Sequence, residues 1–132
     1  MSLKIALSSM IAAGMLSACA TTIDREYMLN STLLSYERTI RWGDFTAANG
    51  FRKEGEVIKG VAPTSDRQIK VGAYDILSKT VSEDGQAAQQ MVEIGYYYSD
   101  DVRMKKLRDA QTWEYDGAQQ RWVITSPFPA FE

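Results

Sequence analysis

One long amphipathic helix is predicted near the start of the chain, and it constrains what the later residues must build. Between residues 23 and 41, Leu29, Leu33, Tyr36 and Ile40 recur at the spacing that puts apolar side chains on one helical stripe. The apolar residues Ile23, Tyr27 and Leu34 are expected to widen this stripe to one side. Such a stripe must be buried against another element. Because the later residues have the character of strands, we expect the helix to pack on a sheet.

Local signals set the expected limits of the two helices. Thr21-Thr22-Ile23-Asp24 fits the Ser/Thr-x-x-Asp/Glu capping pattern, so the long helix is expected to begin there. Gly43 can adopt the left-handed conformation that ends a helix, and Asp44 can cap a short second helix that ends near Asn49.

The second half of the chain is predicted to form strands. Residues 69–81 are rich in strand-forming residues, residues 89–98 alternate between apolar and polar side chains, and residues 104–115 are expected to form a further strand that carries many charges. Asp116-Gly117 is a hairpin signal that leads into residues 121–125. Strands joined by hairpins are antiparallel. The expected fold class is therefore α+β, with a long N-terminal helix and a short helix packed on a curved antiparallel sheet of three or four strands.

The first 18 residues have the character of an export signal. Lys4 is followed by an uncharged run from Ile5 to Met15, and small residues precede Cys19. This run is shorter than the roughly 20 residues that a helix needs to cross a bilayer. Leu16-Ser17-Ala18-Cys19 resembles the lipobox of bacterial lipoproteins. The alternative is an ordinary secretory leader with a chance cysteine near its end.

The lipobox resemblance implies a lipid anchor and a location. It implies a diacylglyceryl thioether on the Cys19 sulfur, cleavage after Ala18 and N-acylation, for instance with palmitate. In that family Asp after the cysteine favours inner-membrane retention, so Ala20 implies the outer membrane, facing the periplasm. The expected organisation is a signal peptide over residues 1–18, a lipidated tether over 19–22 and a single α+β domain over 23–132.

Composition excludes several classes of function. The chain has 15 basic and 17 acidic residues and no basic run typical of nucleic-acid binding, so we expect no nucleic-acid partner. It contains no histidine, which removes the commonest general base and metal ligand. Cys19 is the only cysteine, so no internal disulfide can form. We expect no metal site and no cofactor.

The mature domain also resembles cystatin-like and NTF2-like α/β rolls. The resemblance rests on the long helix, the Gly43-Asp44-Phe45 junction and the C-terminal segments Trp113–Gly117 and Arg121–Ile124. NTF2-like enzymes commonly use a buried Asp with Tyr or His for proton transfer, and such rolls often dimerise through the sheet, which makes a homodimer one expected arrangement. The candidate acids are Asp44, Asp75, Glu93 and Asp109, and the candidate donors are Tyr74, Tyr96, Tyr97 and Tyr98.

Two groups of side chains are candidates for contacts with a partner. Aromatic residues dominate the energetics of interfaces, and they also fill small cores. The aromatic candidates for an interaction surface are Tyr97, Trp113, Phe128 and Phe131. The basic residues Arg103, Lys105, Lys106 and Arg108 could meet lipid headgroups or an acidic partner, or they could protect an edge strand from aggregation.

The sequence therefore predicts a lipid-anchored protein of the bacterial envelope that is not an enzyme. We expect a binding or assembly module, held to the membrane through Cys19, with another envelope protein as its partner. The alternative is a small-molecule binder or a minor proton-transfer enzyme on an NTF2-like roll. A third reading is a structural lipoprotein without a specific ligand.

Overall fold

The computed structural model describes residues 16–53 and 68–132, and it describes side chains in the first helix from Ile23 onward. Most of the expected signal peptide lies outside the described residues, and so does the segment 63–66, whose proline, serine and aspartate predict a turn. The described elements are α1 (Leu16–Arg41), α2 (Phe45–Ala48), the 3₁₀ turn η1 (Asn49–Phe51), β1 (Ile69–Val81), β2 (Ala87–Tyr98), β3 (Asp101–Asp116) and β4 (Arg121–Ile124).

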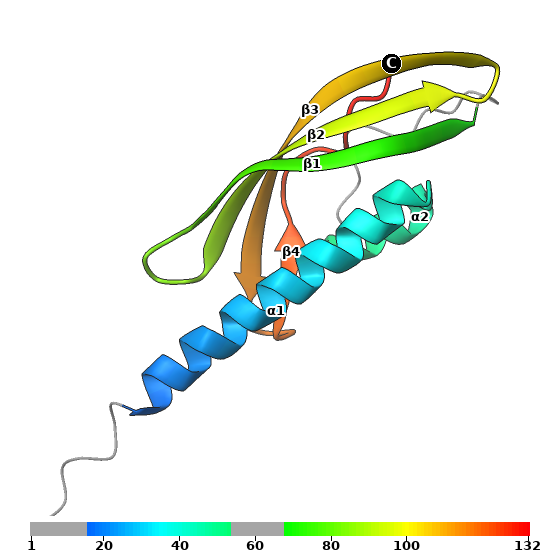
Figure 1. The fold of residues 1–132 in the computed structure, drawn as a ribbon. Coiled ribbons are helices and arrows are strands. Elements are labelled where there is room, and N and C mark those ends of the chain that lie inside the picture. The colour runs from blue at the N-terminus through cyan, green and yellow to red at the C-terminus, as the bar shows by residue number, and fades with distance from the viewer. Residues whose placement is uncertain (1–15, 54–67) are drawn as a thin grey trace, which may run out of the picture.

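The four strands form one antiparallel sheet in the order β1-β2-β3-β4, and α1 runs across one face of it (Figure 1). The expected α+β class is confirmed. Irregularities in the β1–β2 pairing after Val71 and after Ile76, and in the β2–β3 pairing after Tyr96, interrupt the regular register. Such bulges bend a strand and increase its twist, which is consistent with the curvature of the sheet.

The start of α1 differs from the prediction. The helix begins at Leu16, so Thr21 and Thr22 lie inside it and do not cap it. The segment expected to be a tether, residues 19–22, is therefore helical. At the other end the prediction is confirmed, because Gly43 has φ of 69° and the Ala47 amide donates to Asp44 Oδ1 at 3.0 Å.

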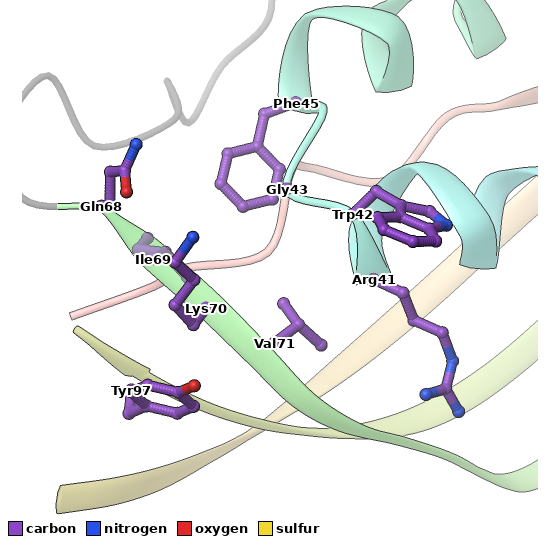
Figure 2. Close-up of a pocket in the computed structure, with 9 residues that line it drawn as sticks. All are labelled: Arg41, Trp42, Gly43, Phe45, Gln68, Ile69, Lys70, Val71 and Tyr97. Carbon is purple, nitrogen blue, oxygen red and sulfur yellow. The ribbon is translucent and has the colours of Figure 1, made fainter. Parts of the chain in front are cut away.

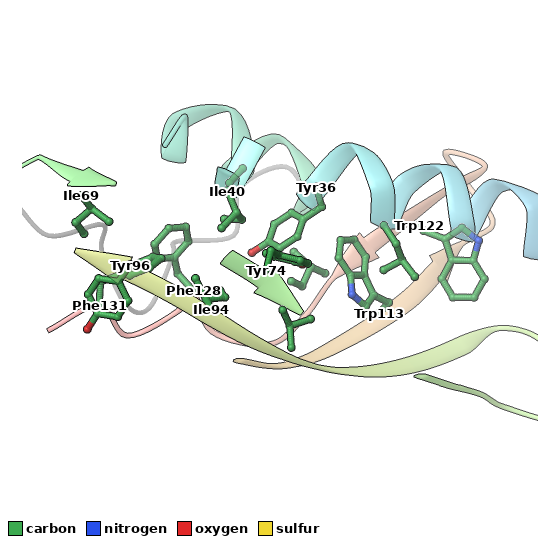
Figure 3. Close-up of a cluster of buried hydrophobic side chains, with 14 of the residues drawn as sticks. Tyr36, Ile40, Ile69, Tyr74, Ile94, Tyr96, Trp113, Trp122, Phe128 and Phe131 are labelled. Atoms are coloured by element: carbon green, nitrogen blue, oxygen red, sulfur yellow. The ribbon is translucent and has the colours of Figure 1, made fainter. Parts of the chain in front are cut away.

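The core lies between α1 and the face of the sheet that it covers, here called the inner face. Every second side chain of β2 points there, and Val92, Ile94 and Tyr96 are at most 3 % exposed. The predicted stripe of α1 is buried against them (Figure 3), but the residues expected to widen it, Ile23, Tyr27 and Leu34, are exposed. Tyr36 meets Trp113 edge-on, with ring centroids 5.2 Å apart.

The residues after β4 return across the sheet and complete the core. Phe131 packs on Tyr96 with ring centroids 5.0 Å apart, and Phe128 packs on Phe45 at 5.3 Å. The Tyr96 hydroxyl donates to the main-chain oxygen of Glu132 and accepts from its amide. This aromatic cluster joins α2, β2 and the C-terminal segment.

Candidate functional site

The predicted aromatic interaction surface does not form. Trp113, Phe128 and Phe131 are 0, 5 and 9 % exposed and belong to the core. Trp113 lies opposite Ala88 in the β2–β3 register and so faces inward, and the two phenylalanines are covered because the C-terminal segment folds back on the sheet. Only Tyr97 remains partly exposed, on the other face of the sheet, here called the outer face.

A surface cleft lies where α1 ends and β1 begins (Figure 2). Its volume is about 430 Å³. Arg41, Trp42 and Phe45 contribute from the helical side, and Lys70 and Tyr97 contribute from the sheet. The remaining lining residues are Gly43, Gln68, Ile69 and Val71. We refer to this hollow as the α1–β1 cleft.

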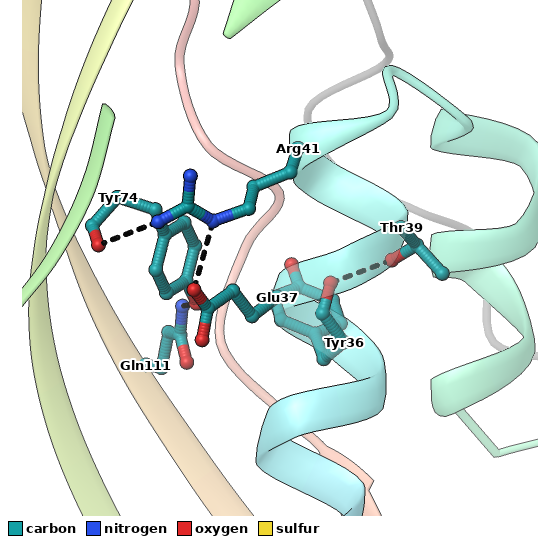
Figure 4. A network of polar contacts seen from close by, with 6 residues as sticks. All are labelled: Tyr36, Glu37, Thr39, Arg41, Tyr74 and Gln111. Atoms are coloured by element: carbon teal, nitrogen blue, oxygen red, sulfur yellow. Dashed lines mark hydrogen bonds and ion pairs between the residues drawn. The ribbon is translucent and has the colours of Figure 1, made fainter. Parts of the chain in front are cut away.

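The α1–β1 cleft combines positive charge with exposed aromatic surface. Trp42 is 82 % exposed, although tryptophan is usually buried. The Arg41 guanidinium donates to Glu37 Oε1 at 2.8 Å and to the main-chain oxygen of Tyr74 at 3.4 Å, which ties it to the edge of β1 (Figure 4). Lys70 is exposed and lies opposite Tyr97 in the β1–β2 register. This arrangement suits a ligand or partner that carries an anionic group beside a flat apolar part.

A second group of polar side chains lies inside the domain, around Gln111. The Gln111 amide nitrogen donates to Asp109 Oδ2 at 2.9 Å and to the Tyr74 hydroxyl at 3.0 Å. Its oxygen accepts from Trp113 Nε1 at 3.2 Å and from the Gln90 amide at 3.4 Å. Gln90, Asp109 and Gln111 are each at most 5 % exposed. We call Gln111 and its four hydrogen-bond partners, Tyr74, Gln90, Asp109 and Trp113, the Gln111 cluster.

Burial shifts the ionisation of this cluster. It raises the pKa of the Asp109 carboxyl, and the hydrogen bond from Gln111 and the charge of Arg52 offset only part of that rise. Burial likewise raises the pKa values of Tyr36 and Tyr74, so both phenols stay protonated at neutral pH. The Tyr36 hydroxyl is buried without a hydrogen-bond partner among the described residues. A carboxyl with a raised pKa beside phenols is an arrangement that can take part in proton transfer.

The other candidate acids lie away from the interior. Asp44 is an exposed helix cap, and Asp75 is exposed on β1. Glu93 lies on the outer face, 3.5 Å from Lys106 Nζ and 3.7 Å from Arg108 Nε. Of the four candidate acids, Asp109 alone reaches the inner face.

The basic residues of β3 have several partners. Arg103 pairs with Asp101 at 2.9 Å, and Lys105 donates to the main-chain oxygen of Glu132. β4 pairs only with residues 113–116 of β3, so the basic part of β3 has a strand neighbour on one side in the described sheet. This position fits a charged edge that resists association with other strands.

The residues that resemble a lipobox lie in the first turns of α1. Leu16, Ser17, Ala18 and Cys19 are all helical in the structure. In the part of the chain that the structure describes, no helix is long and apolar enough to cross a membrane. No group of three potential metal-binding side chains occurs within residues 16–53 and 68–132 as described.

The fold and the two polar sites define a small α+β domain with one long helix over a four-stranded meander. No protein-family model, curated protein or solved structure matches this chain. The function is therefore inferred from the side chains themselves. Sequence reasoning did not identify the α1–β1 cleft, and it named Asp109 and Tyr74 without their connection through Gln111.

Proposed function

We propose that this chain is a lipid-anchored protein of the bacterial outer membrane that faces the periplasm and acts as a non-enzymatic binding or assembly module. The contact site in this proposal is the α1–β1 cleft. The observation that carries the proposal is the exposure of Trp42 beside Arg41 and Lys70. Tryptophan and arginine are the residue types most enriched where binding energy concentrates in protein interfaces.

The anchor half of the proposal is supported by the sequence. Leu16-Ser17-Ala18-Cys19 supplies the lipobox pattern, and two or more acyl chains at one residue give stable membrane attachment. Confinement to the membrane raises the effective concentration of the domain for any other component of the envelope. A modest contact area at the cleft is then sufficient for association.

The contact site can be tested by site-specific cross-linking in cells. A photoreactive amino acid at position 42 of the full chain is expected to capture one dominant envelope component, which mass spectrometry identifies. The same amino acid at position 46 is the matched control, because Thr46 is exposed on α2 and does not line the cleft. Equal and diffuse capture at both positions would contradict the cleft as the contact site.

The anchor is tested separately by replacing Cys19. Cys19→Ser removes the only sulfur that can carry the thioether, so the variant is expected to leave the membrane fraction or to keep its leader. Membrane fractionation and intact-mass measurement give the readout. Wild-type fractionation of the variant would contradict the anchor.

A second candidate function is favoured by one observation, which is the burial of Asp109 within the Gln111 cluster. A small-molecule binder or proton-transfer enzyme needs a carboxyl whose pKa is raised and nearby phenols, and Asp109, Tyr74 and Tyr36 have these properties. Native mass spectrometry of the purified chain tests it. A retained small molecule that Asp109→Asn releases would support this function over the binding module, and a bare chain in both proteins would contradict it.

A further inference from the structure

Large apolar side chains are exposed along one side of α1. Ile23, Tyr27 and Leu34 are 67, 76 and 49 % exposed. Their separations of four and seven residues place them on a single helical stripe. The buried stripe of α1 has other members, Leu29, Leu33, Tyr36 and Ile40, so the helix has two apolar stripes and the core covers only one.

The edge strand beside α1 also exposes apolar side chains. Ile76 and Leu77 of β1 are 53 and 49 % exposed. Two polar contacts fix β1 beside α1, from Lys79 to the Asn30 side chain and from Arg41 to the main-chain oxygen of Tyr74.

These two contacts also set the direction of β1 relative to α1. Asn30 precedes Arg41 in α1, whereas its partner Lys79 follows Tyr74 in β1. β1 therefore runs antiparallel to the helix. Leu34 lies between the two contacts on α1, and Ile76 and Leu77 lie between them on β1. These three exposed residues therefore lie where the helix and the strand run side by side, and together with Ile23 and Tyr27 they are here called the α1–β1 apolar surface.

The surface begins one helical turn from the proposed anchor. Cys19 lies four residues before Ile23 in the same continuous helix. At roughly 1.5 Å per residue, the two positions are about 6 Å apart along the helix axis, and a separation of four keeps them on one side of the helix. Acyl chains at position 19 would hold this end of α1 at the bilayer surface.

We infer that the α1–β1 apolar surface lies on the membrane, so that α1 runs along the bilayer and not away from it. This inference rests on the lipid anchor of the proposed function. The anchor at Cys19 would place Ile23 next to the bilayer, whose interior is apolar. Tyr27 has the apolar ring and polar tip that favour the membrane interface, and Lys79 and Arg38 lie where they can meet anionic headgroups. A helix with an exposed apolar stripe and polar flanks binds in this plane without crossing it.

Depth-sensitive fluorescence tests the orientation. The lipidated full chain carrying Tyr27→Trp is reconstituted in vesicles of phosphatidylethanolamine and phosphatidylglycerol, with or without bromine on the acyl chains. Bromine quenches only tryptophans that enter the apolar region. The new tryptophan is expected to lose most of its emission, measured as the difference from the wild-type chain. Thr46→Trp is the matched control at an exposed site on α2, and its added emission is expected to persist.

Each outcome separates the orientation from the anchor. If the lipidated chain floats with the vesicles but the tryptophan at position 27 is not quenched, the inference is wrong and the anchor stands. If its emission shifts to the blue with protein density but bromine has no effect, a second copy of the chain covers the surface, and the inference is again wrong. If the chain does not float with the vesicles, the anchor fails, and the inference fails with it.

Discussion

The two faces of the sheet use the same strands for opposite purposes. The inner face carries Tyr96, Trp113 and the Gln111 cluster, all closely packed under α1 or under the C-terminal segment. The outer face carries Glu93 with its two basic partners and the partly exposed Tyr97. Neighbouring residues of one strand therefore have very different environments.

This difference indicates that the inner face stabilises the fold, whereas the outer face is free to contact other molecules. Aromatic rings on the inner face contact other aromatic rings. Charged groups on the outer face form ion pairs that are exposed to water, and these contribute little to the stability of the fold. The α1–β1 cleft lies at the boundary, because Ile69 belongs to the core and Lys70 to the outer face. Substitutions on the two faces should separate these contributions.

The largest difference is expected between the adjacent residues Tyr96 and Tyr97. Tyr96→Ala removes a ring that is 3 % exposed, its contact with Phe131 and both hydrogen bonds to Glu132, so we expect a loss of about 3–5 kcal/mol in the free energy of unfolding. Tyr97→Ala, on the outer face, is expected to cost about 1 kcal/mol. Denaturant unfolding measures both. Equal losses would contradict the assignment of the two faces.

Asp109 should give the inner face a dependence on pH. Because burial raises the pKa of its carboxyl in the folded chain, ionisation of Asp109 opposes folding. The contribution of Asp109 to the free energy of unfolding is most favourable below the ordinary carboxyl pKa of about 4. This contribution is lost as the pH rises through the raised pKa of the carboxyl in the folded chain. Asp109→Asn keeps an oxygen for Gln111 and stays neutral, so its advantage over wild type should grow from acid to neutral pH. Unfolding across that pH range tests the sign, and a constant or reversed difference would contradict it.

The smallest effect is expected on the outer face. Glu93→Gln removes the ion pairs with Lys106 and Arg108, whose side chains are 70 and 69 % exposed. Solvent screens such pairs, so the free energy of unfolding should fall by at most about 1 kcal/mol, and the difference should shrink in high salt. A larger loss that salt does not reduce would show that these charges stabilise the sheet in another way.

Much of the fold could be predicted because the spacing of apolar residues in the sequence matches the periods of a helix and of a strand. The spacing of Leu29, Leu33, Tyr36 and Ile40 gave the buried stripe, and the alternation in β2 gave its inward side chains. The start of α1 could not be read from Thr21 and Thr22. A capping residue marks a helix start only where the preceding residues leave the helix, and here leucine and alanine before it continue the helix.

The sites were less predictable, for two physical reasons. The α1–β1 cleft joins Arg41 and Trp42 to Lys70 and Tyr97, and only tertiary packing brings these residues together. The Gln111 cluster had a usable signal, because Gln90 has the same alternation as Val92 and should therefore face inward. An amide is rarely found in a core, but a buried amide is stable when its hydrogen bonds are satisfied, as those of Gln111 are here.

One hydrogen bond has a consequence for how the protein is made. Trp122 Nε1 donates to the main-chain oxygen of Arg25 at 2.9 Å, across 97 positions of sequence. α1 leaves the ribosome early, but this partner on β4 is synthesised near the end. Until β4 has been synthesised, Leu29, Leu33 and Tyr36 of the helix therefore lack part of their cover, and such exposed apolar segments are prone to aggregation. Because α1, β4 and the residues after β4 share one core, that core can close only after the end of the chain has been synthesised.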